Sequence, residues 1–366
     1  MDCIPLDNQS TLSQGEEENF TGTESEKQLL KDMSNVFYDY GLPIVCMFGI
    51  VGNILNLTIL TRRKLRRSFK TIEQAANACL ISLALSDLMF CLFAFPTTFL
   101  PNEEYYRYNG FILYYGMYSS AVINVFIMSS TWLTVTMAIE RYIAICHPLN
   151  DKLFMTLRKT KLIIVLVFIL SVSFNIPVLW RYKIIPLQCR NVSTPMYQLR
   201  QIPLASNKIV DDAYRLLWAI LGNFIPLFFL IISNICICRK IHLSYKYRQK
   251  FHCDPEANDA NSTLTVTLIV IVVMFFILVA PSEIVMHIAK ITHSENNATY
   301  RAVEVIMNFM QSVNFSVNFV LYCIISPYYR KTLKYIFCCY WRNKRRDSYR
   351  LSMGECSIKM PLKSNL

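Results

Sequence analysis

The chain has 366 residues, of which 54% are hydrophobic and only 17% are charged, whereas soluble proteins carry about 25% charged residues. This composition excludes an intrinsically disordered, collagen-like or coiled-coil chain. The 13 cysteines fall mostly inside apolar runs, which excludes a small disulfide-stabilised domain. The net charge of +12 is spread over several basic segments, which favours contact with anionic lipid over nucleic acid. The composition therefore predicts a multi-pass membrane protein.

Seven windows are long and apolar enough to cross the hydrocarbon core, which takes about 20 residues in a helix. The windows are residues 41–60, 77–100, 110–139, 162–180, 216–238, 260–282 and 305–329. Because lipid offers the backbone no hydrogen bonds, each window is predicted to be a continuous helix, kinked at Pro226 and Pro281. The windows are too uniformly apolar for barrel strands. The predicted fold class is all-α, a bundle of seven transmembrane helices.

The charges of the short loops predict the orientation of this bundle. Residues 61–71 and the tail after the seventh window are rich in Lys and Arg, whereas residues 1–36 are acidic. The positive-inside rule then places the N-terminus outside and the C-terminus in the cytosol. No apolar stretch of a cleavable signal peptide is visible in the first 40 residues. The first span is therefore predicted to direct insertion.

This topology divides the chain into three segments. Residues 1–36 are an extracellular segment, residues 37–337 form the membrane domain, and residues 338–366 form a cytosolic tail. Asn-x-Ser/Thr sequons on the outer side predict glycosylation. The predicted sites are Asn8, Asn19, Asn191 and Asn297.

Asp87 is the single Asp, Glu, Lys or Arg inside the seven windows. A carboxylate in the membrane is costly, so it is a functional candidate, with a structural, hydrogen-bonded carboxylate as the alternative. Other polar side chains that can converge on it are Asn53, Ser130, Asn314 and Asn318. Such an oxygen-rich set suits a small cation with water.

Four short motifs with polar residues lie within the apolar windows or at their ends. They are Gly52-Asn53, Leu-Ser-Asp87, Glu140-Arg141-Tyr142 and Asn318-Phe-Val-Leu-Tyr322. Combined with seven spans and an external N-terminus, they make residues 37 to 340 resemble the rhodopsin-like (class A) G-protein-coupled receptors. Several apolar motifs, among them Phe174-Asn-Ile-Pro177, are similar to the invertebrate FMRFamide-receptor group.

The resemblance implies roles for individual residues. The switch toward the G protein would comprise Glu140, Arg141, Tyr142, Asn318 and Tyr322. An allosteric sodium site would comprise Asp87, Ser130, Asn314 and Asn318, and no other cofactor is implied. A short amphipathic eighth helix is expected at 328–337, followed by palmitoylation of Cys338 and Cys339, for which plain packing is the alternative. Two departures are Phe319, where the family has Pro, and Leu278-Val279-Ala280-Pro281, which lacks the family's aromatic toggle.

The function implied is a plasma-membrane receptor that binds an extracellular ligand and activates a heterotrimeric G protein. Its candidate cytosolic surface is Arg141, the loop from His147 to Lys161, and the segment with Lys246, Arg248 and Lys250. Biogenic amines are disfavoured because Ile123 stands where aminergic relatives have Asp. A Tyr-rich external face favours a peptide, although those tyrosines suit a membrane-interface belt equally well. A class A receptor for a non-peptide ligand is the alternative.

Other classes of membrane protein fit the sequence less well. A transporter or channel predicts internal repeats or several intramembrane charges, and the sequence has one carboxylate and no visible repeat. An intramembrane enzyme predicts paired catalytic groups, which the windows lack. A retinal photoreceptor needs a Lys in the seventh window, where Ser312 stands instead.

Glu283 lies two residues beyond Pro281, near the outer third of the membrane. In receptors of the family that the chain resembles, this position points into the ligand cavity, so the resemblance makes Glu283 the candidate anchor for a cationic ligand. A carboxylate at that depth requires a cationic partner. The partner is either an Arg of the ligand or a basic residue of the receptor's outer rim, namely Arg107, Lys183 or Arg215. The same cavity is expected to include Asn124, Trp218, Asn308 and Gln311.

The resemblance also implies a disulfide between a cysteine at the outer end of the third span and one in the second external loop. In this chain Gly116 stands at the position of the first of these cysteines. Cys189 in the loop therefore lacks that partner. Cys3 is the other cysteine in a clearly external segment. A Cys3–Cys189 bridge is one hypothesis, and a free Cys189 is the alternative.

Overall fold

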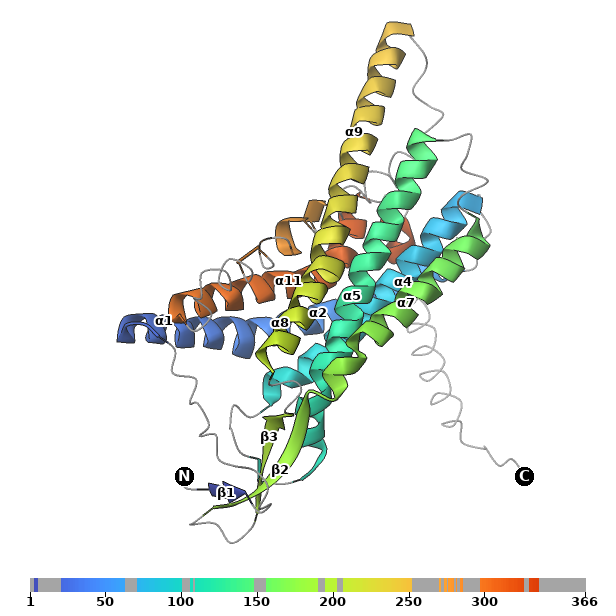
Figure 1. Ribbon diagram of the computed structural model, residues 1–366. Coiled ribbons are helices and arrows are strands. Elements are labelled where there is room, and N and C mark those ends of the chain that lie inside the picture. The colour runs from blue at the N-terminus through green and yellow to red at the C-terminus, as the bar shows by residue number, and fades with distance from the viewer. Residues whose placement is uncertain are drawn as a thin grey trace, which may run out of the picture.

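The computed structural model describes most of the membrane domain and part of its external face. The described residues are 3–5, 21–62, 71–100, 106–107, 109–147, 156–189, 195–202, 207–251, 270, 273–274, 276–279, 281, 284–285, 297–325 and 329–335. Figure 1 shows a bundle of long helices with a small sheet at one end. Five of its helices are long and apolar enough to span a membrane, and a sixth candidate is a helix pair bent by 90°. The predicted sixth span, 260–282, lies largely outside the described residues, although Pro281 is helical.

The helix that contains the first span begins well before the window predicted from the sequence. Helix α1 (Glu24–Ser34), the π-helical turn η1 (Asn35–Gly41) and α2 (Leu42–Leu60) follow one another without a break. Thr23 starts the helix because its hydroxyl accepts from the backbone N–H of Glu26, whose carboxylate accepts in return from the N–H of Thr23. Part of the predicted extracellular segment, 1–36, is therefore a helical extension of the span.

The next three spans agree with their predicted windows in position. Helix α4 (Thr71–Ala94) ends in a 3₁₀ turn, η2 (Phe95–Phe99), and α5 spans Phe111–Cys146. Helix α7 (Leu157–Leu179) is capped by the Thr156 hydroxyl and contains Pro177. Large apolar side chains on α7, such as Leu162 and Leu170, are more than half exposed. This exposure is expected of a surface that faces lipid.

The fifth span has a π-helical turn in its middle. Helix α8 (Lys208–Trp218), η3 (Ala219–Phe224) and α9 (Ile225–Phe251) are continuous, and Pro226 lies in the first turn of α9. The indole N–H of Trp132, on α5, donates to the carbonyl of Leu221 in this turn at 3.1 Å. The sequence predicted a kink at Pro226, and the π-helical turn lies directly before this proline. Helix α9 then extends past the other helices at the top of Figure 1.

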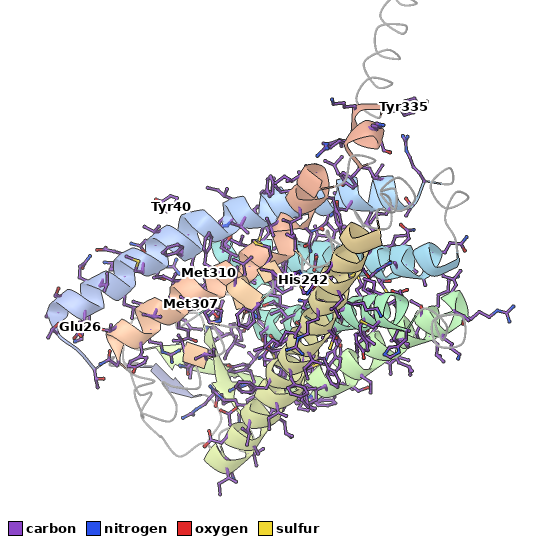
Figure 2. The ribbon with its side chains drawn as sticks, turned by 90° about the horizontal axis from the view of Figure 1, so that it is seen from above. Glu26, Tyr40, His242, Met307, Met310 and Tyr335 are labelled. Carbon is purple, nitrogen blue, oxygen red and sulfur yellow. The ribbon has the colours of Figure 1, made fainter. Side chains whose placement is uncertain are left out.

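The last span is α11 (Ala298–Ile325), followed by a short helix, Tyr329–Tyr335, bent by 90° from it. This short helix lies within the predicted eighth helix, 328–337. Figure 2 shows α1 and α11 side by side, with Glu26 at the tip of α1 beside the first turn of α11. The N-terminal helical extension is thus packed against the last span.

The external end of the bundle carries a three-stranded antiparallel sheet in the order β1-β2-β3. Its strands are β1 (Cys3–Pro5), β2 (Tyr182–Cys189) and β3 (Met196–Gln201). Strands β2 and β3 form a hairpin, with Tyr182 opposite Gln201 and Leu187 opposite Met196. The predicted helical bundle is confirmed, but the sequence analysis did not anticipate this sheet.

Candidate functional site

Asp87 lies at the meeting point of three helices. Its side chain is fully buried on α4, and Ser130 of α5 donates to its Oδ1 at 2.6 Å. The amide nitrogen of Asn318, on α11, donates to its Oδ2 at 2.7 Å. A buried carboxylate is stabilised by such donors. The structure therefore brings together three of the four residues predicted for the sodium site.

The fourth residue, Asn314, is buried one helical turn before Asn318 but makes no hydrogen bond to Asp87 in the described part of the chain. The Asp87 carboxylate and the Ser130 hydroxyl provide the hard oxygen atoms that a small cation prefers. Asn318 presents its nitrogen to Asp87, so it supports the carboxylate in this arrangement. The donor set fits sodium, with Asp87 and Ser130 as the residues that would hold it.

A second polar chain runs from the first span to the short helix after α11. Asn53 donates to the carbonyl of Phe315 at 3.0 Å and accepts from Asn56 at 3.4 Å. The hydroxyl of Tyr329 donates to Asn56 Oδ1 at 2.5 Å. The ring of the buried Tyr322 packs against that of Tyr329, with 5.6 Å between the centroids. The sequence analysis identified Asn53 and Tyr322 but missed Asn56 and Tyr329.

The predicted switch motif lies at the cytosolic end of α5. Glu140 and Arg141 are both buried, with 1% and 5% of their surfaces exposed. The next residue, Tyr142, is partly exposed and its hydroxyl lies 3.2 Å from Nε2 of His147. Burying an acid and an arginine together at the end of a helix suits a device that exposes the arginine when the packing changes.

The residues proposed to bind ligand are described only in part. Glu283 lies outside the described residues. Asn308 donates to the hydroxyl of Tyr38 at 3.3 Å, which ties α11 to η1. The indole N–H of Trp218 is buried and has no hydrogen-bond partner among the described residues. Asn124 and Gln311 are partly buried, and no hydrogen bond joins the four described candidates to one another.

The external rim contains two polar clusters that were not predicted from the sequence, and the first of them is ionic. Asp211 of α8 pairs with Arg181 at 2.8 Å and with Arg215 at 2.7 Å. Glu26 accepts from the Thr299 hydroxyl of α11 at 2.9 Å and from the backbone N–H of Thr23 at 2.7 Å. These hydrogen bonds lower the pKa of Glu26. The Thr23-Glu24-Ser25-Glu26 capping box is a sequence signal that would have found the second cluster.

The predicted modification sites are mostly outside the described residues. This applies to Asn8, Asn19, Asn191, Cys338 and Cys339. Asn297 is described, and its Oδ1 accepts from the backbone N–H of Thr299 at 2.9 Å at the start of α11. Its glycosylation remains a prediction.

Comparison with known proteins identifies the class. Residues 39–340 match the family described as serpentine type 7TM GPCR chemoreceptor Srw. The match covers most of the chain, so the chain belongs to this family of seven-transmembrane G-protein-coupled receptors. It is a multi-pass membrane protein of the receptor class, and the transporter and channel alternative is not favoured.

Individual relatives have low identity over long alignments. The chain is 25% identical to the FMRFamide receptor of Drosophila melanogaster over 87% of its own length. It is 25% identical to galanin receptor 2a of Danio rerio over 82% of its length, and 28% identical to the cholecystokinin receptor of Xenopus laevis over 59%. It spans 56% of the Drosophila receptor's length and 78% of the Danio receptor's. The predicted resemblance to FMRFamide-type receptors is confirmed.

Proposed function

We propose that this receptor binds an extracellular peptide, amidated and FMRFamide-like, at the plasma membrane and activates a heterotrimeric G protein in the cytosol. The observation that carries the proposal is the similarity to relatives named for FMRFamide, galanin and cholecystokinin. A ligand that prefers one packing of the helices shifts the receptor toward it by its differential affinity.

The external geometry supports a peptide over a small amine. Ile123 of α5 packs against the apolar cluster that includes Phe90 and Phe315. An ammonium group would find no carboxylate at this position.

On the cytosolic side, the proposal assigns the G-protein contact to the end of α5 and to α9. Arg141 is buried, whereas Lys246 is exposed near the C-terminal end of α9. Helix α9 extends beyond the other helices in Figure 1. Exposed basic residues here also suit anionic lipid. Measuring G-protein activation in membranes that lack anionic lipid distinguishes a contact of these basic residues with the G protein from a contact with lipid.

The peptide anchor is proposed to be Glu283, with Asn124, Trp218, Asn308 and Gln311 around the same ligand. Of the basic residues that compete as its partner, Arg215 already pairs with Asp211. The internal alternatives for the partner of Glu283 are Arg107, Lys183 and Arg215, and for Arg215 the carboxylate of Asp211 competes. An Arg of the peptide would then bind Glu283 by a charge-assisted, bidentate contact.

A panel of synthetic peptides tests the proposed class of ligand. Amidated FMRFamide-type peptides, galanin and cholecystokinin are applied to cells that express the receptor, and calcium and cyclic nucleotide are measured. We expect an amidated peptide to give a saturable response that Arg141→Ala abolishes at equal surface expression. If a non-peptide ligand activates the receptor while every peptide fails, the peptide assignment is wrong.

The anchor is tested with a matched pair of agonists. Glu283→Gln is expected to weaken an Arg-containing agonist at least about tenfold, since truncating a charge-assisted contact costs about 2 to 5 kcal/mol. An analogue with citrulline in place of Arg keeps the shape without the charge, and its affinity is expected to change little. Equal losses for both peptides would show that Glu283 supports the receptor's own structure.

A further inference from the structure

The hairpin over the external face is held without the bridge that receptors of this class place at the third span. Gly116 of α5 has no thiol, and a Cβ added there would lie 3.3 Å from the Tyr106 hydroxyl and 3.8 Å from Leu199 Cδ1. Residues of the first external loop and of β3 thus already occupy this space. Tyr106 and Tyr197 exchange two backbone hydrogen bonds of 2.8 Å. The hairpin therefore docks on the bundle by backbone pairing.

The outer edge of the same hairpin pairs with the N-terminal strand. In the β1–β2 ladder Cys3 is directly opposite Cys189, Ile4 is opposite Gln188 and Pro5 is opposite Leu187. Directly opposed residues of antiparallel strands have Cα atoms about 4.5 to 5.5 Å apart. Disulfides need about 4.4 to 6.8 Å between Cα atoms. The register alone places the two backbones within bridging range.

The other cysteines of the chain offer these two no competing partner on the same side of the membrane. Seven lie within the membrane-spanning helices or at their cytosolic ends, namely Cys46, Cys79, Cys91, Cys146, Cys236, Cys238 and Cys323. The segments predicted to be cytosolic contain Cys253, Cys338, Cys339 and Cys356. Disulfides form in the oxidising secretory pathway through which external segments pass.

We infer that Cys3 and Cys189 form a disulfide that fixes the N-terminal strand to the external hairpin. The two thiols lose two protons and two electrons as the Sγ–Sγ bond forms. A protein or glutathione disulfide in the secretory lumen accepts the electrons and becomes two thiols. The hairpin has no disulfide to α5. The Cys3–Cys189 disulfide instead attaches the opposite edge of the hairpin, strand β2, to the N-terminal strand β1.

The bridge would be a second attachment of the N-terminal arm to the rest of the receptor. At the other end of the arm, Ala298 donates its backbone N–H to the carbonyl of Thr21 at 3.0 Å, and Glu26 accepts from Thr299 at 2.9 Å. The arm is therefore attached to the start of α11 at one end and to the hairpin at the other.

Cleavage of the arm tests the bridge directly. A receptor with an N-terminal epitope and a protease recognition sequence inserted after Gly15 is expressed on intact cells and cleaved. Free thiols are then blocked, and the sample is denatured in detergent without reductant. We expect the epitope fragment to stay attached to the receptor until dithiothreitol is added. In Cys3→Ser the fragment should separate without reduction, whereas the matched control Cys323→Ser should behave as wild type.

Two results would overturn the inference. One is separation of the wild-type fragment under non-reducing conditions. The other is a fragment linked to a second receptor copy, seen as a reducible band of dimer size. Peptide mapping of the unmodified wild type is the independent measurement, which does not depend on the folding of any variant. It is expected to recover Cys3 and Cys189 in one linked peptide, and recovery of both as alkylated free thiols contradicts the bridge.

Discussion

At the scale of single residues, Glu26 shows how one exposed carboxylate joins distant segments. It accepts from Thr23 on its own helix and from Thr299 at the start of the last span. The backbone hydrogen bond from Thr23 and the hydroxyl of Thr299 lower its pKa below the usual 4.5. Its contribution to stability is therefore present above the usual pKa and is lost as the pH falls through the lowered value.

This linkage predicts a pH-dependent effect of Glu26→Gln. At pH 7 the variant should unfold at a lower temperature than wild type, and the difference should shrink as the pH falls through the lowered pKa of Glu26, because the wild-type carboxylate then becomes protonated too. The difference in unfolding temperature is measured by thermal unfolding of the solubilised receptors over a range of pH. Glu24→Gln is the control, because Glu24 pairs with Lys27 of the same helix. A difference that persists at low pH would show that shape, not charge, matters at this position.

Asn56 and Tyr329 form a buried pair that attaches the short helix after α11 to the first span. Their hydrogen bond is 2.5 Å long, and their exposed fractions are 0% and 4%. Tyr329→Phe leaves the amide oxygen of Asn56 without its donor, which should cost about 1 to 3 kcal/mol of stability. The measurement is the free energy or temperature of unfolding of the solubilised receptor.

The matched control is Tyr335→Phe, because that hydroxyl belongs to a side chain that is 58% exposed. Adding Asn56→Val to Tyr329→Phe should cost less than Asn56→Val costs in wild type, since the pair is then lost only once. Additive effects of the two changes would mean that the hydrogen bond does not couple them.

At the scale of elements, glycines decide how closely the first span approaches its neighbours. A Cβ on Gly49 of α2 would lie 2.5 Å from Cys91 Sγ of α4 and 2.5 Å from Ser316 Oγ of α11. The Ser316 hydroxyl is held in place by a hydrogen bond to the carbonyl of Val45 at 2.9 Å. Small residues permit such close packing of helices in membranes. The contact among α2, α4 and α11 therefore depends on Gly49.

Gly49→Ala is accordingly expected to destabilise the receptor by about 1 to 3 kcal/mol through overpacking. Gly110→Ala is the control, because a Cβ there meets no atom within 4 Å among the described residues. It should cost less than Gly49→Ala, because it changes only the N-cap residue of α5 and creates no clash. Thermal unfolding and surface expression of the two variants provide the comparison. If both variants behave as wild type, the helices can separate at Gly49 without cost.

At the scale of the whole molecule, Asp87 connects three spans through one carboxylate. Its partners, Ser130 and Asn318, come from α5 and α11, and Phe90 and Phe315 pack nearby with ring centroids 4.1 Å apart. A cation bound there would favour the packing in which these groups stay together. By linkage it must oppose any ligand that prefers another packing.

Sodium is therefore expected to weaken agonist binding and to raise the unfolding temperature of wild type relative to potassium at equal ionic strength. Asp87→Asn should remove both effects, because it removes the charge that the ion compensates. Asp39→Asn, which changes an exposed carboxylate, should keep them. The unfolding measurement needs no agonist, so it remains informative before the ligand is known. A sodium response retained in Asp87→Asn would exclude the site.

The sequence by itself determined the class of the molecule, because the cost of placing charge and unpaired backbone in lipid leaves few alternatives. Apolar windows located the spans, loop charges oriented them, and Asp87 stood out as the one carboxylate inside the seven windows. The motifs around Asn53, Arg141 and Asn318 indicated the receptor family. These inferences depend on local composition and spacing, which a single chain displays without reference to its partners in space.

The contacts between distant polar groups, and the helix and sheet contacts at the ends of the spans, became visible only in the tertiary structure. The pairing of Asp87 with Ser130 was predicted, whereas the Asn56–Tyr329 and Glu26–Thr299 contacts each join residues more than 250 positions apart. The external sheet likewise requires strands from distant parts of the chain, with Cys3 opposite Cys189. Short strands and single hydrogen bonds have little signature in local sequence, since their free energy arises only when the packed helices bring both partners together.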